Sequence, residues 1–155
     1  MNKTEYLRET IDLTKAIETR FLELGKRLYK IREEKLWLDS YNNYTEFLDT
    51  ARINPAMASM LVSVYKGYVI EGGKDEEELR GIGYSNLYES LPLIESDGVN
   101  KALNKAKTLP RSDIKDEVRA MRHGEHTHDI GTRRFGVCAC GKFIEIHGQE
   151  KANQS

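Results

Sequence analysis

The stretch Leu13–Ile31, LTKAIETRFLELGKRLYKI, decides the fold of this chain. Its large apolar side chains recur every three or four residues, at Leu13, Ile17, Phe21, Leu24, Leu28 and Ile31. This spacing puts all of them on one face of an α-helix. Because residues 3–36 contain no proline and one glycine, the sequence predicts a single helix there, roughly 50 Å long. Its apolar face is predicted either to be buried inside the monomer or to form the seam of a homodimer.

Shorter helices are predicted after this long one. Asn43 and Glu46 have capping-box spacing before a helix over 45–51, and Asn54-Pro55 begins a helix that Gly72-Gly73 ends after Ile70. The remaining expected elements are an acidic helix over 75–80, a helix capped by Ser85 and ended by Pro92, a helix over 98–108, and a final helix from Ser112 to Arg122. The pairs 45–51 with 55–68 and 75–80 with 85–93 have helix-turn-helix character.

Composition excludes several classes of protein. The chain has 155 residues, with 24 basic and 25 acidic side chains and a formal net charge of -1, so bulk positive charge does not hold it to nucleic acid. No apolar run approaches the length of a membrane span, and the first residues, MNKTEYLRETIDLTK, lack the apolar core of a signal peptide. The two cysteines lie too close together for a disulfide framework, so we expect a cytoplasmic protein.

Charge is distributed unevenly along the chain. Residues 71–98 hold 8 acidic and 2 basic side chains, whereas 99–122 hold 7 basic and 3 acidic ones. The basic segment is a candidate phosphate-binding surface, and a solvated helix face is the alternative. The candidate nucleic-acid contacts are Lys101, Lys105, Lys115, Arg119 and Arg122, with Arg133 and Arg134 further along the chain.

The C-terminal histidines and cysteines predict a zinc site. His126 and His128 form one closely spaced pair, and Cys138 and Cys140 form a second pair after a short interval. Two such pairs supply the four donors of a tetrahedral structural zinc site, and Phe135, Phe143 and Ile144 favour a small ββ ribbon around it. His123 and His147 are reserve ligands, and two free thiols beside surface histidines are the alternative.

The expected fold is therefore mainly α. It comprises a helical domain over 1–122, a zinc ribbon or knuckle over 123–147 and a tail over 148–155. The metal is expected to be structural, because a site with two cysteines and two histidines is usually closed. No Walker loop, G-x-S-x-G or H-E-x-x-H is present in the sequence, which predicts a protein without enzymatic activity.

Three stretches resemble a group of small phage- and plasmid-borne proteins. They are LGKRLYKIREEKLWLDSYNNYTEFLDTARINPAMASMLVSVYKGYV, GIGYSNLYESLPLI and LPRSDIKDEVRAMR, and the resemblance spans residues 23–142. It implies a helical region with helix-turn-helix character before a short Cys/His knuckle, in a mobile-element protein of the bacterial cytoplasm. Its implied zinc ligands are His126, His128, Cys138 and Cys140, with C-x-C replacing the commoner C-x2-C. It implies no base-reading residues, because the Pro55 helix lacks them.

Three functions are compatible with these features. The first is a DNA-associated regulator that contacts phosphates through the basic residues named above, with the long helix as its candidate dimer seam. The second is a phage-encoded, anti-CRISPR-like inhibitor of an RNA-guided nuclease, which would bind through the acidic residues Asp75–Glu78 or the apolar Pro55 helix. The third is a scaffold whose long helix forms an oligomer.

Overall fold

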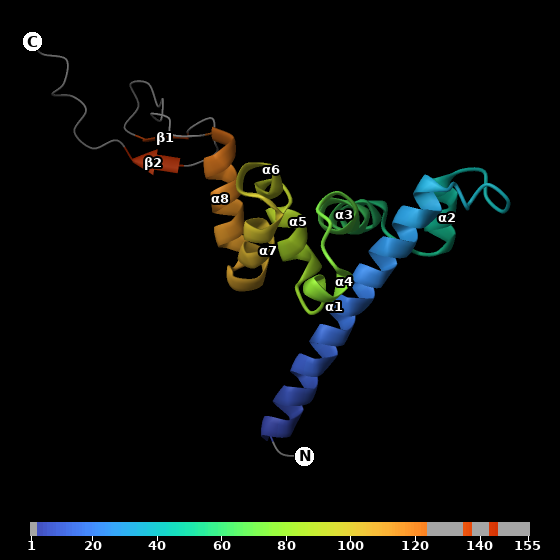
Figure 1. Cartoon of the computed structure of the whole chain (residues 1–155), viewed down its shortest axis with the longest axis horizontal. Coiled ribbons are helices and arrows are strands. Elements are labelled where there is room, and N and C mark those ends of the chain that lie inside the picture. The colour runs from blue at the N-terminus through green and yellow to red at the C-terminus, as the bar shows by residue number, and fades with distance from the viewer. Residues whose placement is uncertain (1–2, 124–134, 138–142, 146–155) are drawn as a thin grey trace, which may run out of the picture. The chain divides into compact units, whose positions relative to one another are not determined.

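The protein is mainly helical, as its sequence predicts. A computed structural model describes residues 3–123, 135–137 and 143–145. The chain divides into two compact units, Met1–Val118 and Arg119–Ser155. The helices are α1 (Lys3–Glu33), α2 (Tyr44–Thr50), α3 (Pro55–Tyr65), the π-helix η1 (Lys66–Glu71), α4 (Glu76–Leu79), α5 (Tyr84–Ser90), α6 (Leu93–Asp97), α7 (Val99–Thr108) and α8 (Arg111–His123) (Figure 1).

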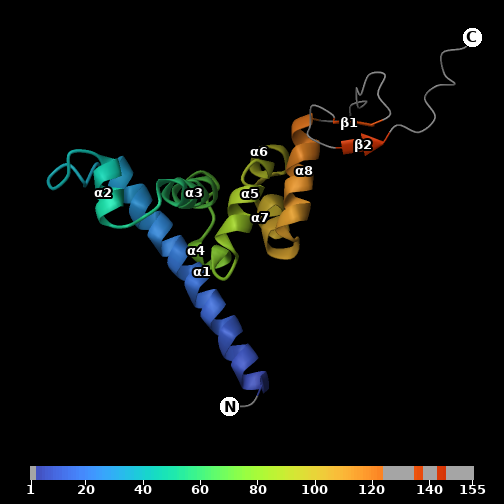
Figure 2. The same ribbon diagram turned by 180° about the vertical axis from the view of Figure 1, so that it is seen from behind.

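The predicted long helix is α1, and the other helices cover only part of it. Its C-terminal half packs against α3 (Figure 2). Leu28 is buried there, and Phe21 and Leu24 lie against the same core cluster. Its N-terminal half is exposed as far as Ile17. The helix ends at Glu33 rather than residue 36, because Lys35 adopts a left-handed conformation with φ 52°.

Local sequence signals position α2 and α3 as predicted. Asn43 caps α2, its side-chain oxygen accepting a hydrogen bond of 2.9 Å from the backbone N–H of Glu46. The predicted capping box is only half formed, because the Glu46 carboxylate accepts from the backbone N–H of Asn42 instead. Asn54 caps α3 by accepting from the N–H groups of Ala56 and Met57, and Pro55 occupies the first turn. The caps fix where each helix begins, and α3 then buries Leu61 and Val62 against α1.

The end of the Pro55 helix differs from the expected regular α-helix. From Lys66 to Glu71 the chain forms the π-helix η1, and Gly72 and Gly73 follow it as the predicted stop. Tyr68, within η1, is fully buried, and its hydroxyl lies 2.5 Å from the Ser90 hydroxyl of α5. A π-helix has more residues per turn than an α-helix, so its side chains do not follow the α-helical spacing on which the sequence prediction is based.

Two predicted serine caps are wrong. Ser85 lies inside α5, which begins at Tyr84, and the Glu18 carboxylate of α1 accepts a hydrogen bond of 2.9 Å from the Tyr84 N–H. Ser112 lies inside α8, which begins at Arg111. In α5 the acceptor for a first-turn N–H therefore comes from a distant helix, which makes a local serine cap unnecessary.

The remaining helices build the second half of the unit Met1–Val118. Asp75 and Glu78 form a complete capping box at α4, and Pro92 separates α5 from α6 as expected. α7 packs against both α5 and α6, and buries Ala102, Leu103 and Ala106. On α8, Ile114 and Val118 are buried.

A small hairpin follows the helices in sequence. β1 (Phe135–Val137) pairs antiparallel with β2 (Phe143–Glu145), with Phe135 opposite Glu145 and Val137 opposite Phe143. These strands lie where the sequence predicts a ββ ribbon. The four predicted zinc ligands are outside the described residues.

Candidate functional site

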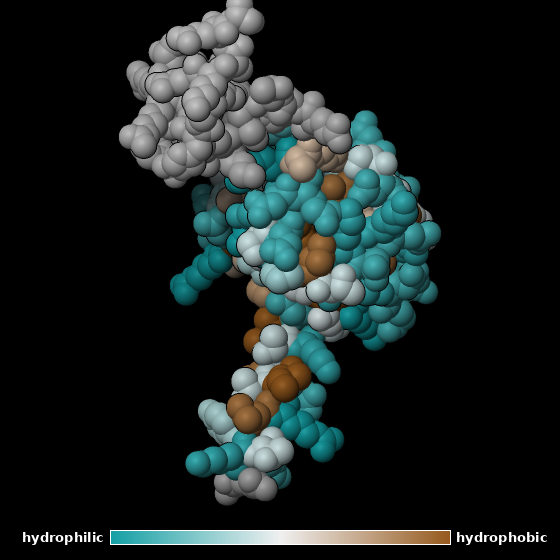
Figure 3. All heavy atoms as spheres, turned by 90° about the vertical axis from the view of Figure 1, so that its left-hand side faces the viewer, coloured by the Kyte–Doolittle hydropathy of each residue, from teal (hydrophilic) through white to brown (hydrophobic). Residues whose placement is uncertain are grey.

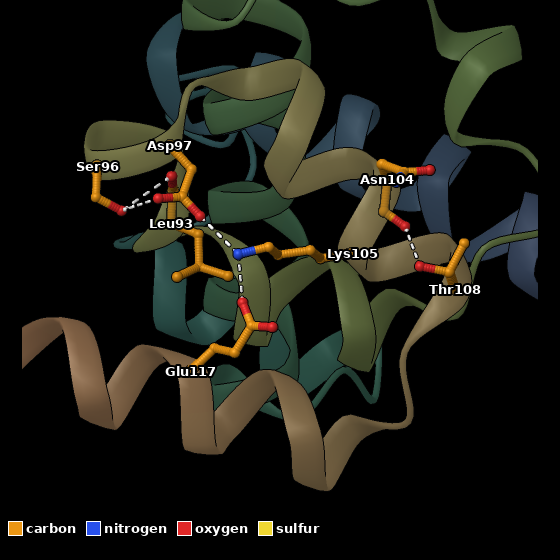
Figure 4. A network of polar contacts seen from close by, with 7 residues as sticks. All are labelled: Leu93, Ser96, Asp97, Asn104, Lys105, Thr108 and Glu117. Atoms are coloured by element: carbon orange, nitrogen blue, oxygen red, sulfur yellow. Dashed lines mark hydrogen bonds and ion pairs between the residues drawn. The ribbon is translucent and has the colours of Figure 1, made fainter.

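Lys105, a predicted phosphate contact, is already bound to carboxylates of its own chain. Its Nζ lies 2.7 Å from Asp97 Oδ2 and also forms an ion pair with Glu117 (Figure 4). The hydrogen bond from Lys105 lowers the pKa of Asp97, and the same bond raises the pKa of Lys105. The two carboxylates balance this ammonium group, so it supplies little net attraction for a phosphate.

Glu89 forms ion pairs with two more cations of the basic segment. Arg111 donates to its carboxylate at 2.6 Å from Nη2 and 3.0 Å from Nε, and Lys115 Nζ lies 3.6 Å from it. Of the other candidates, Lys101, Arg119 and Arg122 are exposed. Lys101 and Arg122 have no carboxylate within ion-pair distance among the residues that the structure describes. The basic segment is therefore partly neutralised by the acidic segment that precedes it.

The acidic residues proposed as a partner surface are paired in the same way. Glu76 binds Lys26 of α1 at 2.7 Å, Glu77 binds Arg80 at 2.9 Å, and Glu78 binds Lys74 at 2.9 Å. The hydrogen bond with Lys74 lowers the pKa of Glu78. Both charged segments thus form ion pairs within the chain, which reduces their net potential toward an outside partner.

The helix-turn-helix candidate α2–α3 lacks base-reading side chains on its second helix. α3 buries Ala58, Leu61, Val62, Val64 and Tyr65. Its exposed positions after Pro55 are Ala56 and Ser59, and no residue of α3 carries a charge. A recognition helix needs polar or basic side chains that reach base edges. α3 is therefore a core helix of this domain.

The predicted metal ligands lie almost entirely outside the described residues. His126, His128, Cys138, Cys140 and the reserve ligand His147 lie outside the described residues, as do Arg133 and Arg134. His123 is the last residue of α8 and is exposed. Within the described part of the chain, no three His, Cys, Asp or Glu side chains are grouped to hold a metal ion.

The N-terminal half of α1 carries a surface of a different kind. Five large apolar side chains are strongly exposed there: Tyr6 61%, Leu7 63%, Ile11 55%, Leu13 62% and Ile17 46%. Together with Thr10 and Thr14 they lie on one side of the helix, which we call the uncharged face (Tyr6, Leu7, Thr10, Ile11, Leu13, Thr14, Ile17). Figure 3 shows hydrophobic side chains gathered along this part of α1.

The sequence pattern identified only part of this face. Leu13 and Ile17 belong to the predicted stripe, but Tyr6, Leu7 and Ile11 were not predicted to join it. The missed signal is the spacing Leu7, Thr10, Thr14 and Ile17, which continues the stripe by steps of three and four once threonine is accepted on an apolar face.

Comparisons with known proteins do not assign the chain to a family. No protein-family model matches the chain, and neither a curated protein nor a solved structure matches it. In the described ranges, no helix is both long and apolar enough to cross a membrane. The chain's own residues therefore carry the functional argument.

Proposed function

We propose that this protein is a non-enzymatic binding protein that acts through protein–protein contact, with the uncharged face of α1 as its binding surface. One observation carries the proposal. The charged segments form ion pairs within the chain, whereas the five large apolar side chains of the uncharged face are exposed. Contiguous exposed apolar surface on a water-soluble fold is typical of an interaction site.

The physical driving force is apolar burial. Covering such side chains contributes roughly 25 cal/mol per Å² of apolar area removed from water. α1 is already helical and its C-terminal half is anchored on α3, so little conformational entropy is lost when a partner binds. A preformed helix that presents an apolar face is a common way to bind a groove or another helix.

A phage-encoded inhibitor of a bacterial defence nuclease is one form that this function takes. Such a protein works in the bacterial cytoplasm, in agreement with the resemblance noted in the sequence. The pairing of Glu76, Glu77 and Glu78 with cations of the same chain favours contact through the uncharged face over contact through the acidic segment.

The test uses immobilised full-length protein and a bacterial lysate. We expect Leu13→Glu to abolish retention of a partner, because it places a charge within the contact. Ala16→Glu is the matched control: it adds the same charge to an exposed position outside the uncharged face, about 120° around the helix from Thr10. The proposal would be contradicted if wild type and both variants retained the same proteins equally. It would also be contradicted if neither wild type nor the control retained any protein.

Binding to DNA is a second candidate, favoured by the exposed cations. Lys101 and Arg122 have no carboxylate within ion-pair distance in the described part of the chain, and Arg119 is also exposed. With Arg133 and Arg134 they remain candidate phosphate contacts, whereas Lys105 and Lys115 are weakened by their ion pairs. We expect any binding to a labelled duplex to fall steeply with salt and to weaken further in Arg122→Glu. No binding at low salt would remove this candidate.

A structural zinc bound by His126, His128, Cys138 and Cys140 is also proposed. Thiolate and imidazole donors are the ligands that zinc prefers, and the hairpin of β1 and β2 supports a ribbon at this point in the sequence. When bound, the metal would hold the chain segments together, since its binding free energy is also folding free energy.

Metal analysis tests the zinc proposal directly. We expect one zinc ion per chain in protein purified without chelator, and less than half of that in Cys138→Ser and Cys140→Ser. His147→Asn is the control, because it removes only a reserve ligand. A metal content near zero in wild type, or one unaffected by both serine substitutions, would refute the site.

A further inference from the structure

We propose that the uncharged face binds a second copy of this chain, so that two α1 helices pair over residues 6–17. The proposal rests on the proposed function, because it names the partner of the same surface.

The spacing is that of a coiled-coil seam. Leu7, Thr10, Thr14 and Ile17 alternate in steps of three and four, and Phe21, Leu24, Leu28 and Ile31 continue the same steps. The C-terminal part of this seam is covered by α3 and its core cluster. The N-terminal part is exposed, although its pattern is the one that packs a helix against a helix.

The charged residues all lie away from the seam. Between Tyr6 and Ile17 the charged side chains are Arg8, Glu9, Asp12 and Lys15. At 100° per residue, Arg8, Asp12 and Lys15 fall on the side of the helix opposite Thr10, whereas Glu9 lies beside the face, about 100° from Thr10. Tyr6, Leu13 and Ile11 flank the seam. Between Tyr6 and Ile17 the seam and the side chains that flank it are therefore uncharged, and Glu9 borders them next to Leu13.

The two threonines in the seam already have hydrogen-bond partners within their own helix. Thr10 Oγ1 donates to the Tyr6 carbonyl at 2.8 Å, and Thr14 Oγ1 donates to the Thr10 carbonyl at 2.9 Å. Each hydroxyl proton is thus bound within the helix, and the face can leave water without stranding a donor. This arrangement suits a dry helix–helix contact better than a charged or strongly polar partner.

A second copy is the occupant that matches this surface. A two-fold contact places the same surface of both copies together, so a charged surface would be repelled by the like charges of its copy. The uncharged face meets its own copy with no such repulsion, and each copy covers the exposed apolar side chains of the other. A partner with a charged binding surface would have to bury its charges against the uncharged face, where no side chain of opposite charge offsets the cost of their desolvation.

Sedimentation equilibrium of the full chain tests the pairing. At high protein concentration we expect a mass of twice the 17.8 kDa of one chain, falling toward the monomer on dilution. Leu13→Glu and, independently, Leu7→Glu should raise the dimer Kd at least about 100-fold. Ala16→Glu should leave it within about threefold of wild type, and circular dichroism should show equal helix content in all four proteins.

The outcomes distinguish pairing with a second copy from the more general proposal that the uncharged face binds a protein. A wild-type dimer that only the Leu13→Glu and Leu7→Glu proteins lose supports both. A wild-type monomer at every concentration overturns the pairing, and the lysate experiment then decides alone whether the face binds another protein. A dimer that persists in Leu7→Glu and Leu13→Glu also overturns the pairing, because its interface lies elsewhere.

Discussion

Gly25→Ala is expected to destabilise the protein by about 2 kcal/mol, even though alanine is the better helix former. A Cβ added at Gly25 would lie 2.7 Å from the Leu61 carbonyl oxygen and 3.2 Å from the Leu61 carbonyl carbon. These are backbone atoms of α3, so no side-chain rotation relieves the clash. The two helices have to move apart at the contact that buries Leu28 and Leu61.

The measurement is thermal and denaturant unfolding of the full chain. A loss of about 2 kcal/mol corresponds to a fall in Tm of about 10 °C for a unit of this size. The expected net loss already includes the gain of about 1 kcal/mol in helix propensity, so the clash itself costs about 3 kcal/mol.

Gly67→Ala is the matched control. There the added Cβ would meet the Leu91 Cδ2 atom at 2.5 Å, and no backbone atom lies among its near neighbours. Because the end of a leucine side chain rotates away at low cost, we expect a smaller loss than at Gly25. Equal or greater loss at Gly67 would show that helix separation is not the cause of the Gly25 effect.

Helix positions could be predicted here wherever the deciding interaction is local. Asn43 and Asn54 each cap a helix within three residues, and the structure confirms both predictions. Pro92 and Gly72 also act on their immediate neighbours. The predictions at Ser85 and Ser112 failed because neither serine begins its helix, and in α5 the Glu18 carboxylate arrives from a helix 66 residues earlier.

The candidate site could be predicted only in part, because exposure depends on tertiary packing. The sequence places Leu13 and Leu28 on the same stripe, but only the position of α3 makes one exposed and the other buried. Likewise, the basic and acidic segments are evident from composition. That Asp97 and Glu117 both bind Lys105 follows from how α6, α7 and α8 pack, which no local pattern encodes.

Ser90→Ala is the second substitution with a large expected effect, again a loss of about 2 kcal/mol. Ser90 Oγ donates to the Leu87 carbonyl at 2.9 Å, and therefore accepts from the Tyr68 hydroxyl at 2.5 Å. Both residues are fully buried. Alanine at position 90 leaves the Tyr68 hydroxyl as a buried donor without its acceptor, and this desolvation cost adds to the lost hydrogen bond.

Tyr68→Phe is expected to cost less, about 1 kcal/mol, because Ser90 keeps its bond to Leu87 when the tyrosine hydroxyl is removed. In the double variant Ser90→Ala with Tyr68→Phe, the loss should be smaller than the sum of the two single losses, since no donor is stranded. Denaturant unfolding of the four proteins gives this coupling, and strictly additive losses would contradict it.

The same pair predicts an alkaline limit to stability. Burial raises the pKa of Tyr68 above its ordinary value of 10.0. The folded state therefore holds the phenolic proton more tightly than the unfolded state. The resulting stability is complete below pH 10 and is lost as the pH rises from there through the folded pKa. Tyr68→Phe should lose less stability than wild type between pH 9 and about pH 11, because the group that titrates is gone. Parallel curves for the two proteins would mean that Tyr68 is not the group responsible.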